Sequence, residues 1–171
     1  MALAYLITFR CYGTWLHGDT RGSVDRHGAA GYGDPVVAPS ALRQRWEQSR
    51  LRGEPFGLGP DAQPVVQDAL EDVCERRGWV LLAVNVRTNH VHAVVAAEVA
   101  PEVVLNSLKA WATRRLREAG LLAADAQAWS RHGSTVHLWS DKQVAAAQDY
   151  VLHGQGGPLG RPPGDGRGVD D

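Results

Sequence analysis

The feature that most restricts the fold is a pair of apolar segments joined by a very short turn. Residues 79–86 (WVLLAVNV) and residues 90–97 (HVHAVVAA) both have the aliphatic, β-branched composition of strands, and Thr88 and Asn89 form the turn between them. Strands with so short a connection pair antiparallel, because a parallel pair needs a crossover of a dozen or more residues. The sequence therefore predicts a β-hairpin over residues 79–97.

Segments on both sides of this hairpin complete a recognisable order. Two further strands are predicted at residues 3–9 (LAYLITF) and 134–139 (STVHLW). Helical periodicity predicts one helix from an N-cap at Asp61 to Gly78, a second that begins at Pro101, and a third that Asp141 caps and that carries Tyr150. The order strand, helix, strand, strand, helix, strand is that of the α+β ferredoxin-like βαββαβ fold. We therefore expect one antiparallel sheet with two helices on one face, an open opposite face, and an extra C-terminal helix with the tyrosine.

The length of the chain and its local composition predict one domain. A chain of 171 residues is long enough for one hydrophobic core. Residues 1–153 are expected to form that domain, with residues 13–60 as a loop and helical insertion. Residues 154–171 are rich in Gly and Pro and are expected to be a disordered tail.

Composition excludes several classes of protein. The net charge of −1 gives no overall nucleic-acid signature, so a DNA-binding surface would have to be a local patch of arginine and lysine. Cys11 and Cys74 form no C-x-x-C pair, which argues against a disulfide scaffold or a zinc site and favours the cytoplasm. The N-terminal apolar segment is predicted to be a strand and not a signal peptide. We expect no membrane span, because no apolar run approaches the necessary length.

A pair of histidines marks a candidate metal site on the second strand of the hairpin. Side chains alternate between the two faces of a strand, so His90 and His92 point to the same face, with Asn85 and Arg87 nearby. Their Cα atoms are about 7 Å apart, and the two rings can converge on one ion. Magnesium or manganese is favoured over zinc, because no cysteine or third nearby histidine completes a tetrahedral set. The alternative is a pair of surface histidines that only form hydrogen bonds.

Tyr150 is a candidate nucleophile. A phenolate can attack a DNA phosphodiester in line, which leaves a free 3′-hydroxyl and a 5′-phosphotyrosine. The covalent bond preserves the energy of the phosphodiester, so the strand can be rejoined without a cofactor. A metal would polarise the scissile phosphate. The alternative is a tyrosine half-buried against the sheet, a common place for this side chain.

Several motifs, taken in order, resemble a known family. The segments TNHVHAVV at 88–95 and YVLHGQG at 150–156 are similar to those of the single-tyrosine HUH transposases, which include insertion-sequence enzymes and their REP-associated relatives. The segments LITFRCYGTWLHGDTRGS at 6–23, LKAWATRRL at 108–116 and GSTVHLW at 133–139 also resemble a branch of that family. The resemblance covers most of residues 3–156, and the order of the motifs is more specific than the histidine pair alone.

The resemblance implies a function and a set of site residues. His90 and His92 match the metal-binding pair, and Tyr150 matches the nucleophile. The better-known members have Gln or Asn four residues after the tyrosine, where this chain has Gly154; Gln155, or alternatively His153, would then be the third ligand. The resemblance also implies Mg²⁺ or Mn²⁺, a homodimer, and single-stranded DNA with hairpin or palindromic ends.

Basic side chains provide candidate phosphate contacts, although each could equally belong to a solvated helix face. The candidates are Arg10, Arg87, Lys109, Arg114, Arg115 and Arg117. The function expected from the sequence is a metal-dependent single-strand DNA endonuclease and strand transferase in DNA transposition. The alternatives are a domesticated enzyme of the same family that processes repeats, and a non-catalytic ferredoxin-like module that binds nucleic acid.

Overall fold

The computed structural model describes residues 1–14 and 41–154. Its four-stranded sheet has the order β2-β3-β1-β4, with every neighbouring pair antiparallel. The strands are β1 (Ala4–Cys11), β2 (Val80–Val86), β3 (His90–Ala96) and β4 (Trp129–Leu138). The hairpin of β2 and β3 is the one predicted from its short turn, and the strand order is that of the ferredoxin-like fold.

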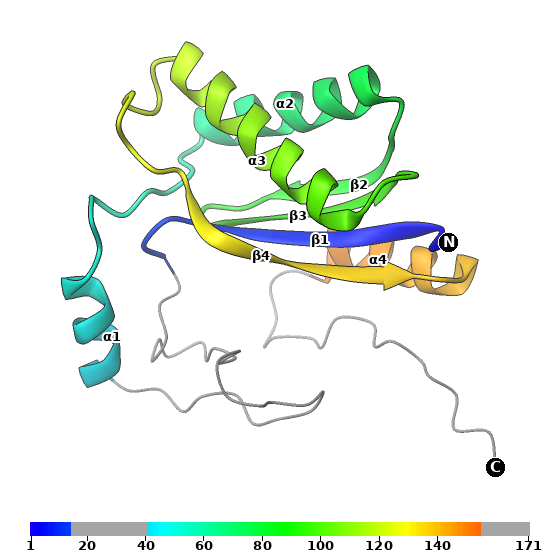
Figure 1. The fold of residues 1–171 in the computed structure, drawn as a ribbon, viewed down its shortest axis with the longest axis horizontal. Coiled ribbons are helices and arrows are strands. Elements are labelled where there is room, and N and C mark those ends of the chain that lie inside the picture. The colour runs from blue at the N-terminus through cyan, green and yellow to red at the C-terminus, as the bar shows by residue number, and fades with distance from the viewer. Residues whose placement is uncertain (15–40, 155–171) are drawn as a thin grey trace.

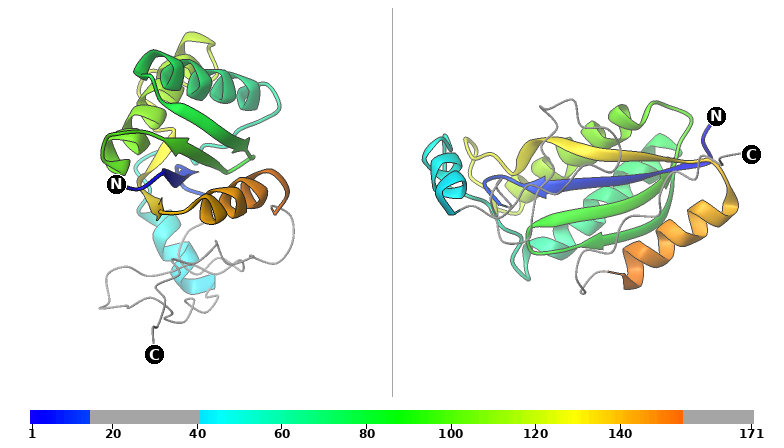
Figure 2. Two further views of the ribbon diagram at one scale, coloured as in Figure 1. Left: turned by 90° about the vertical axis from the view of Figure 1, so that its right-hand side faces the viewer. Right: turned by 90° about the horizontal axis from the view of Figure 1, so that it is seen from below.

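Helices lie on both faces of this sheet. The helices are α1 (Ala41–Ser49), α2 (Ala62–Arg77), α3 (Pro101–Glu118) and α4 (Asp141–His153). Helices α2 and α3 cover one face, whereas α4 packs on β2 and β3 from the other (Figure 1, Figure 2). The expectation of an open face was therefore wrong in part, because α4 folds back beneath its own sheet. Helix α1 stands beyond the end of the sheet at which β1 ends and β3 begins (Figure 1).

The helix ends test three predictions about capping. Gly78 ends α2 with φ of 68°, the left-handed conformation that glycine adopts without a steric penalty, as predicted. Asp61 occupies the N-cap position of α2, but its side chain makes no capping hydrogen bond. The prediction that Asp141 caps α4 was wrong, because the Ser140 hydroxyl accepts the hydrogen bond from the Gln143 N–H at 3.3 Å.

Strand β4 is longer than its composition predicts. It begins at Trp129 and not at Ser134, because its polar first half pairs with β1 along the edge of the sheet, where Arg131 and His132 are exposed. Gly133 is required in this half, since a Cβ atom there would lie 2.7 Å from the carbonyl oxygen of Thr8. An edge strand faces solvent on one side, and it therefore lacks the continuous apolar pattern on which the prediction depended.

A bulge in β2 changes which side chains share a face. The register between β2 and β3 shifts between Leu81 and Ala83. Leu81 therefore faces α2 and α3, whereas Leu82 and Ala83 both contribute to the cluster under α4. Strict alternation along β2 would place Leu82 with the helix-facing side chains and Leu81 with Asn85 and Arg87, and the bulge reverses both.

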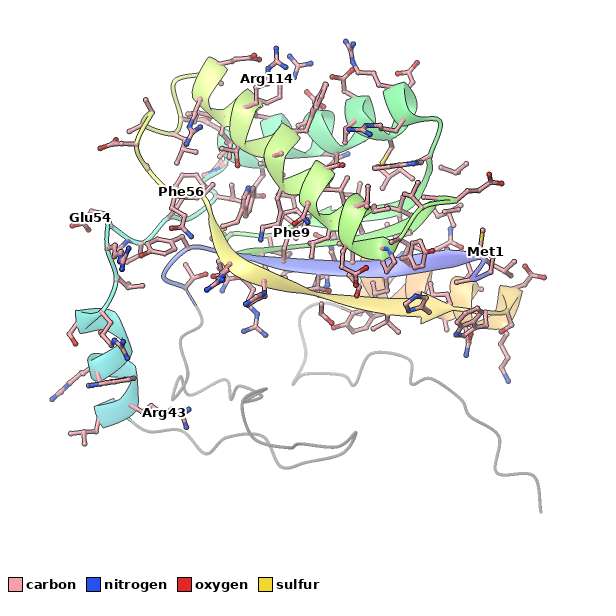
Figure 3. The ribbon with its side chains drawn as sticks, viewed as in Figure 1. Met1, Phe9, Arg43, Glu54, Phe56 and Arg114 are labelled. Carbon is pink, nitrogen blue, oxygen red and sulfur yellow. The ribbon has the colours of Figure 1, made fainter. Side chains whose placement is uncertain are left out.

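The core is divided unequally between the two faces. Among the described residues, 24 buried side chains form the cluster between the sheet and α2 and α3, including Phe9 (Figure 3). Seven buried residues form the smaller cluster under α4, among them Val94, Ala147 and Val151. None of the helices in the described part of the chain is long and apolar enough to cross a membrane.

Candidate active site

The predicted histidine pair lies on the α4 side of the sheet. The ring centroids of His90 and His92 are 4.7 Å apart, with the planes at 82°. His92 is buried, and the register places it between Thr8 on β1 and Asn85 on β2. Strand alternation alone brings the two rings together, as the sequence predicted.

Two neighbouring side chains fix the orientation of these rings. The Nδ1 atom of His90 lies 2.6 Å from Oδ1 of Asn89. An amide oxygen only accepts hydrogen bonds, so Nδ1 carries the proton and the lone pair of the His90 ring is on Nε2. Nδ1 of His92 lies 2.7 Å from Oγ1 of Thr8. Cation binding through Nε2 of His92 requires the Thr8 hydroxyl to accept this bond. Outer contacts of this kind orient the histidine ligands of metal sites.

The surroundings of His92 keep its ring neutral. Burial, together with the smaller effects of the nearby positive charges of His90, Arg10 and Arg87, lowers the pKa of His92 from 6.5 to about 3. A histidine must be neutral to bind a metal ion. His92 therefore has the protonation state that a ligand needs at neutral pH.

Tyr150 extends from α4 toward the same histidine. Its ring centroid lies 5.7 Å from that of His92, with the planes at 80°. The side chain is half-buried, and burial raises the pKa of Tyr150 above its ordinary value. The tyrosine is therefore a phenol at neutral pH and needs activation before it can attack.

Polar contacts hold α4 in this position. The amide of Asn85 on β2 donates to the carbonyl of Val151 at 2.9 Å, and the amide of Gln148 on α4 donates to the carbonyl of Leu82 at 3.1 Å. The Val151 carbonyl is in the last turn of α4 and has no acceptor role inside the helix, so the Asn85 amide satisfies it. Because Val151 follows Tyr150 directly, this bond fixes the tyrosine over the sheet of its own chain.

The candidates for a third metal ligand are His153 and Gln155, beyond the histidine pair. Within residues 1–14 and 41–154, no three His, Cys, Asp or Glu side chains are close enough to hold a metal ion together. His153 is exposed at the end of α4, and its Nδ1 lies 3.1 Å from Oδ1 of Asp149. Gln155, the other candidate from the sequence, lies outside the described residues, as do the predicted tail and most of the predicted loop.

The predicted DNA-contacting residues fall into two groups. Arg10 pairs in register with His90, and both Arg10 and Arg87 act electrostatically on His92, so these two are at the site. The other four belong to α3, on the opposite side of the sheet. Arg114 pairs with Glu118 at 3.0 Å on the outer surface of the helix layer (Figure 3). The remaining three are Lys109, Arg115 and Arg117, whose partners are the carbonyl of Ser130, the carboxylate of Asp72 and the carbonyl of Ala126.

Three polar residues of the site were missed or only partly recognised from the sequence. Thr8 and Asn89 orient the histidines, and Asn85 holds α4 as well as lying near the pair. Asn89 had been assigned only to the turn. Asn89 precedes His90 in the sequence, and Thr8 lies on β1 opposite His92. A polar residue next to each histidine was the signal that could have identified these orienting contacts.

Comparison with known proteins identifies the family. The model of the family described as IS200-like transposase matches residues 58–152, more than half of the chain. The chain belongs to the IS200-like transposases. This transposase therefore acts in DNA transposition, and the match includes β2, β3 and Tyr150 but neither β1 nor α1.

Two solved structures similar to this transposase are also transposases, and the first supports its fold. A candidate transposase from Deinococcus radiodurans R1 is 16% identical, with a TM-score of 0.51 over 88% of this chain and 89% of that chain. A REP-associated tyrosine transposase bound to a REP hairpin is 12% identical, with a TM-score of 0.46 over 88% of this chain and 66% of that chain. A search of the curated proteins found no match.

Proposed function

We propose that this transposase cuts and rejoins single-stranded DNA through a covalent bond to Tyr150, with help from a divalent cation. The observation that carries the proposal is the convergence of Tyr150, His92 and His90 from two separate elements on one face of the sheet. An oxygen atom faces the Nδ1 atom of each histidine, which is the outer contact that orients histidine ligands in metal sites. Because the chain belongs to a transposase family, we infer that its substrate is DNA.

The reaction would proceed in two balanced steps. The Tyr150 phenol loses its proton, and its oxygen attacks the phosphorus of one phosphodiester. The bond from phosphorus to the 3′ oxygen breaks, and that oxygen leaves as a 3′-hydroxyl after it takes up a proton. The 5′ end is now esterified to Tyr150. Attack by the 3′-hydroxyl of another strand reverses these steps, joins the DNA and restores the phenol.

His90 and His92 fit the role of cation ligands, because both are imidazoles whose Nδ1 atoms face an oxygen partner. When bound, Mg²⁺ or Mn²⁺ would neutralise charge on the scissile phosphate. Gln155 or His153 would complete the ligand set. Arg10 and Arg87 would hold the phosphate by charge, because both are next to the histidine pair.

The test is a denaturing gel of the protein with labelled single-stranded DNA from its own locus, with and without Mg²⁺ or Mn²⁺. We expect a metal-dependent band of DNA bound covalently to protein, which Tyr150→Phe abolishes because only the hydroxyl is lost. His90→Ala and His92→Ala should each abolish the metal-dependent covalent band. Comparison of His153→Ala with Gln155→Ala identifies the third ligand.

Two controls make the outcome decisive. Tyr5→Phe removes another tyrosine hydroxyl, on the other side of the sheet, and should leave the covalent band unchanged. A native gel should show that Tyr150→Phe still binds the DNA. Normal cutting by Tyr150→Phe would rule out the mechanism, and binding without a covalent band under any metal would favour a non-catalytic module.

A further inference from the structure

Helix α1 and the first residues after it concentrate positive charge outside the segment that matches the family. Residues 41–54 contain four arginines, two in α1 and two just after it, and two glutamates, which gives a net charge of +2 in a chain whose total is −1. The family match begins at residue 58, so this charge is not part of the shared transposase unit. Basic character in an otherwise slightly acidic chain indicates an anionic partner for this helix.

An exposed aromatic side chain lies within this basic group. Trp46 is 57% exposed, and the guanidinium of Arg50 lies 4.6 Å from the centroid of its ring. Residues 43, 46 and 50 are spaced three and four apart, which places Arg43, Trp46 and Arg50 along one side of the helix. Arginines interleaved with an exposed aromatic ring are typical of surfaces that bind unpaired nucleic acid.

The position of α1 relates it to the candidate active site. Figures 1 and 2 show α1 on the same side of the sheet as α4, beyond the end where β3 begins with His90. Figure 3 shows Arg43 on that side and Arg114 on the outer surface of the opposite helix layer. A strand that passes over His90 and Arg10 and continues past the end of the sheet would therefore approach α1 and not α3.

The connector after α1 is fixed to the framework of the site. The N–H of Arg52 donates to the Tyr12 hydroxyl at 2.9 Å, just after the end of β1. The N–H of Phe56 donates to the Tyr12 carbonyl at 2.8 Å, and the N–H of Leu58 donates to the Thr88 carbonyl at 2.7 Å. Thr88 is in the turn that precedes His90. These bonds hold the base of α1 next to the histidine strand.

We propose that α1 is a second DNA-binding element, which holds the unpaired strand on one side of the scissile phosphate. Arg50 contacts a phosphate, and Trp46 stacks on a base. The path of the DNA strand from the candidate active site to α1 rests on the proposed function. The affinity of α1 for single-stranded DNA does not, and it can be measured separately. It predicts binding with little sequence preference, because every base has a face on which an indole can stack.

The experiment measures binding of fluorescent oligothymidylate by anisotropy over a range of salt concentrations. All proteins carry Tyr150→Phe, so that no covalent product forms. Arg50→Gln should weaken binding about fivefold at ~0.1 M salt and lower the slope of log K against log salt by about 0.7, the share of one phosphate contact to a single strand. Trp46→Ala should weaken binding about fivefold or more, and Trp46→Phe should retain most of the affinity.

Matched controls come from other parts of the molecule. Arg77→Gln removes an exposed arginine of α2 that lies over a tryptophan ring, Trp79, on the opposite side of the sheet, and Trp139→Ala removes a tryptophan that is 55% exposed, after the far end of β4. Both should bind as the parent does. Equal effects of Arg50→Gln and Arg77→Gln would overturn the proposal. So would a loss on Trp46→Ala that is as large for the oligoadenylate–oligothymidylate duplex as for the single strand.

The two proposals can fail separately. If Tyr150 is not the nucleophile, the denaturing gel lacks the covalent band, but Arg50→Gln still weakens binding of oligothymidylate. If α1 does not bind DNA, the covalent band forms and the α1 variants bind like their controls. Circular dichroism before each titration ensures that only folded variants are compared.

Discussion

The two faces of the sheet differ in how they are built and in what they do. Toward α2 and α3, on what we call the thick face, the strands present aliphatic and aromatic side chains to two long helices, and the core is continuous. Toward α4, on the thin face, a small apolar cluster occupies only part of the face, and the rest holds the histidines, Thr8 and Asn85. The stability of the domain therefore depends mainly on one face, whereas the candidate chemistry occupies the other.

This division explains why the candidate site can contain polar groups. A buried polar group costs free energy unless it has a partner, and the partners of His92 and of the Val151 carbonyl are side chains that the sheet holds in place. The thick core on the opposite face keeps the strands rigid. Precise placement of a few polar side chains is then possible on the thin face.

The largest effect should come from the thick face. Phe9 is fully buried and packs edge to face against Trp129, with the two ring centroids 4.8 Å apart. Phe9→Ala should lower the free energy of unfolding by about 3–5 kcal/mol, because it leaves a cavity in the main core. Urea denaturation measures this loss. Val151→Ala on the thin face should cost about 2 kcal/mol. If the two variants lose equal stability, the proposed division between the faces is wrong.

A smaller change in stability with a larger change in activity is expected at Asn85. Asn85→Leu removes the hydrogen bond to Val151, and the free energy of unfolding should fall by about 1 kcal/mol. Formation of the covalent DNA adduct should slow about tenfold to a hundredfold, because Tyr150 is less well placed. Single-turnover cleavage measures the rate of adduct formation, and urea denaturation measures the free energy of unfolding.

Gln67 on α2 offers a matched control for that variant. Its amide bonds Glu71 at 3.0 Å on the exposed surface of the thick face. Gln67→Leu should change neither stability nor cleavage by a measurable amount. Cleavage by Asn85→Leu at the parental rate would show that Asn85 has only a structural role.

The smallest effect concerns Asp72 on the outer side of the helix layer. Hydrogen bonds from Arg76 and then Trp111 hold the pKa of Asp72 at about 2, below its ordinary 3.8. Because this pKa is lower in the folded than in the unfolded chain, the stabilisation is full above about pH 4 and is lost as the pH falls toward 2. Urea midpoints of the parent and Asp72→Asn should differ at neutral pH and converge in acid. A constant difference would contradict this assignment.

The sequence predicted the thick face better than the thin one. Periodic apolar residues such as Val66, Leu70 and Leu108 determine both α2 and α3, and Gly78 ends α2 as predicted. The start of β4 and the bulge after Leu81 were not predicted, because edge pairing and bulges depend on the neighbouring strand and not on local composition.

Within the candidate site, spacing predicted the pair of histidines but not the contacts that orient them. The position of Tyr150 next to His92 depends on a helix that returns beneath the sheet, and periodicity gives no information about that return. Thr8 is 84 positions before His92 in the chain, so only the register of β1 with β3 brings the two together. Long-range register is the part of a fold that local patterns specify least.

The turn at Thr88 and Asn89 has a mechanical consequence. The Thr88 carbonyl accepts a hydrogen bond from the N–H of Leu58 in the connector after α1, and the Asn89 side chain orients the ring of His90. Along the connector, the bonds to Tyr12 come first and the bond to Thr88 comes last. A pull on α1 would therefore load the end of β1 before it reached the turn that precedes a candidate metal ligand, so the two strands of the candidate site would share the load.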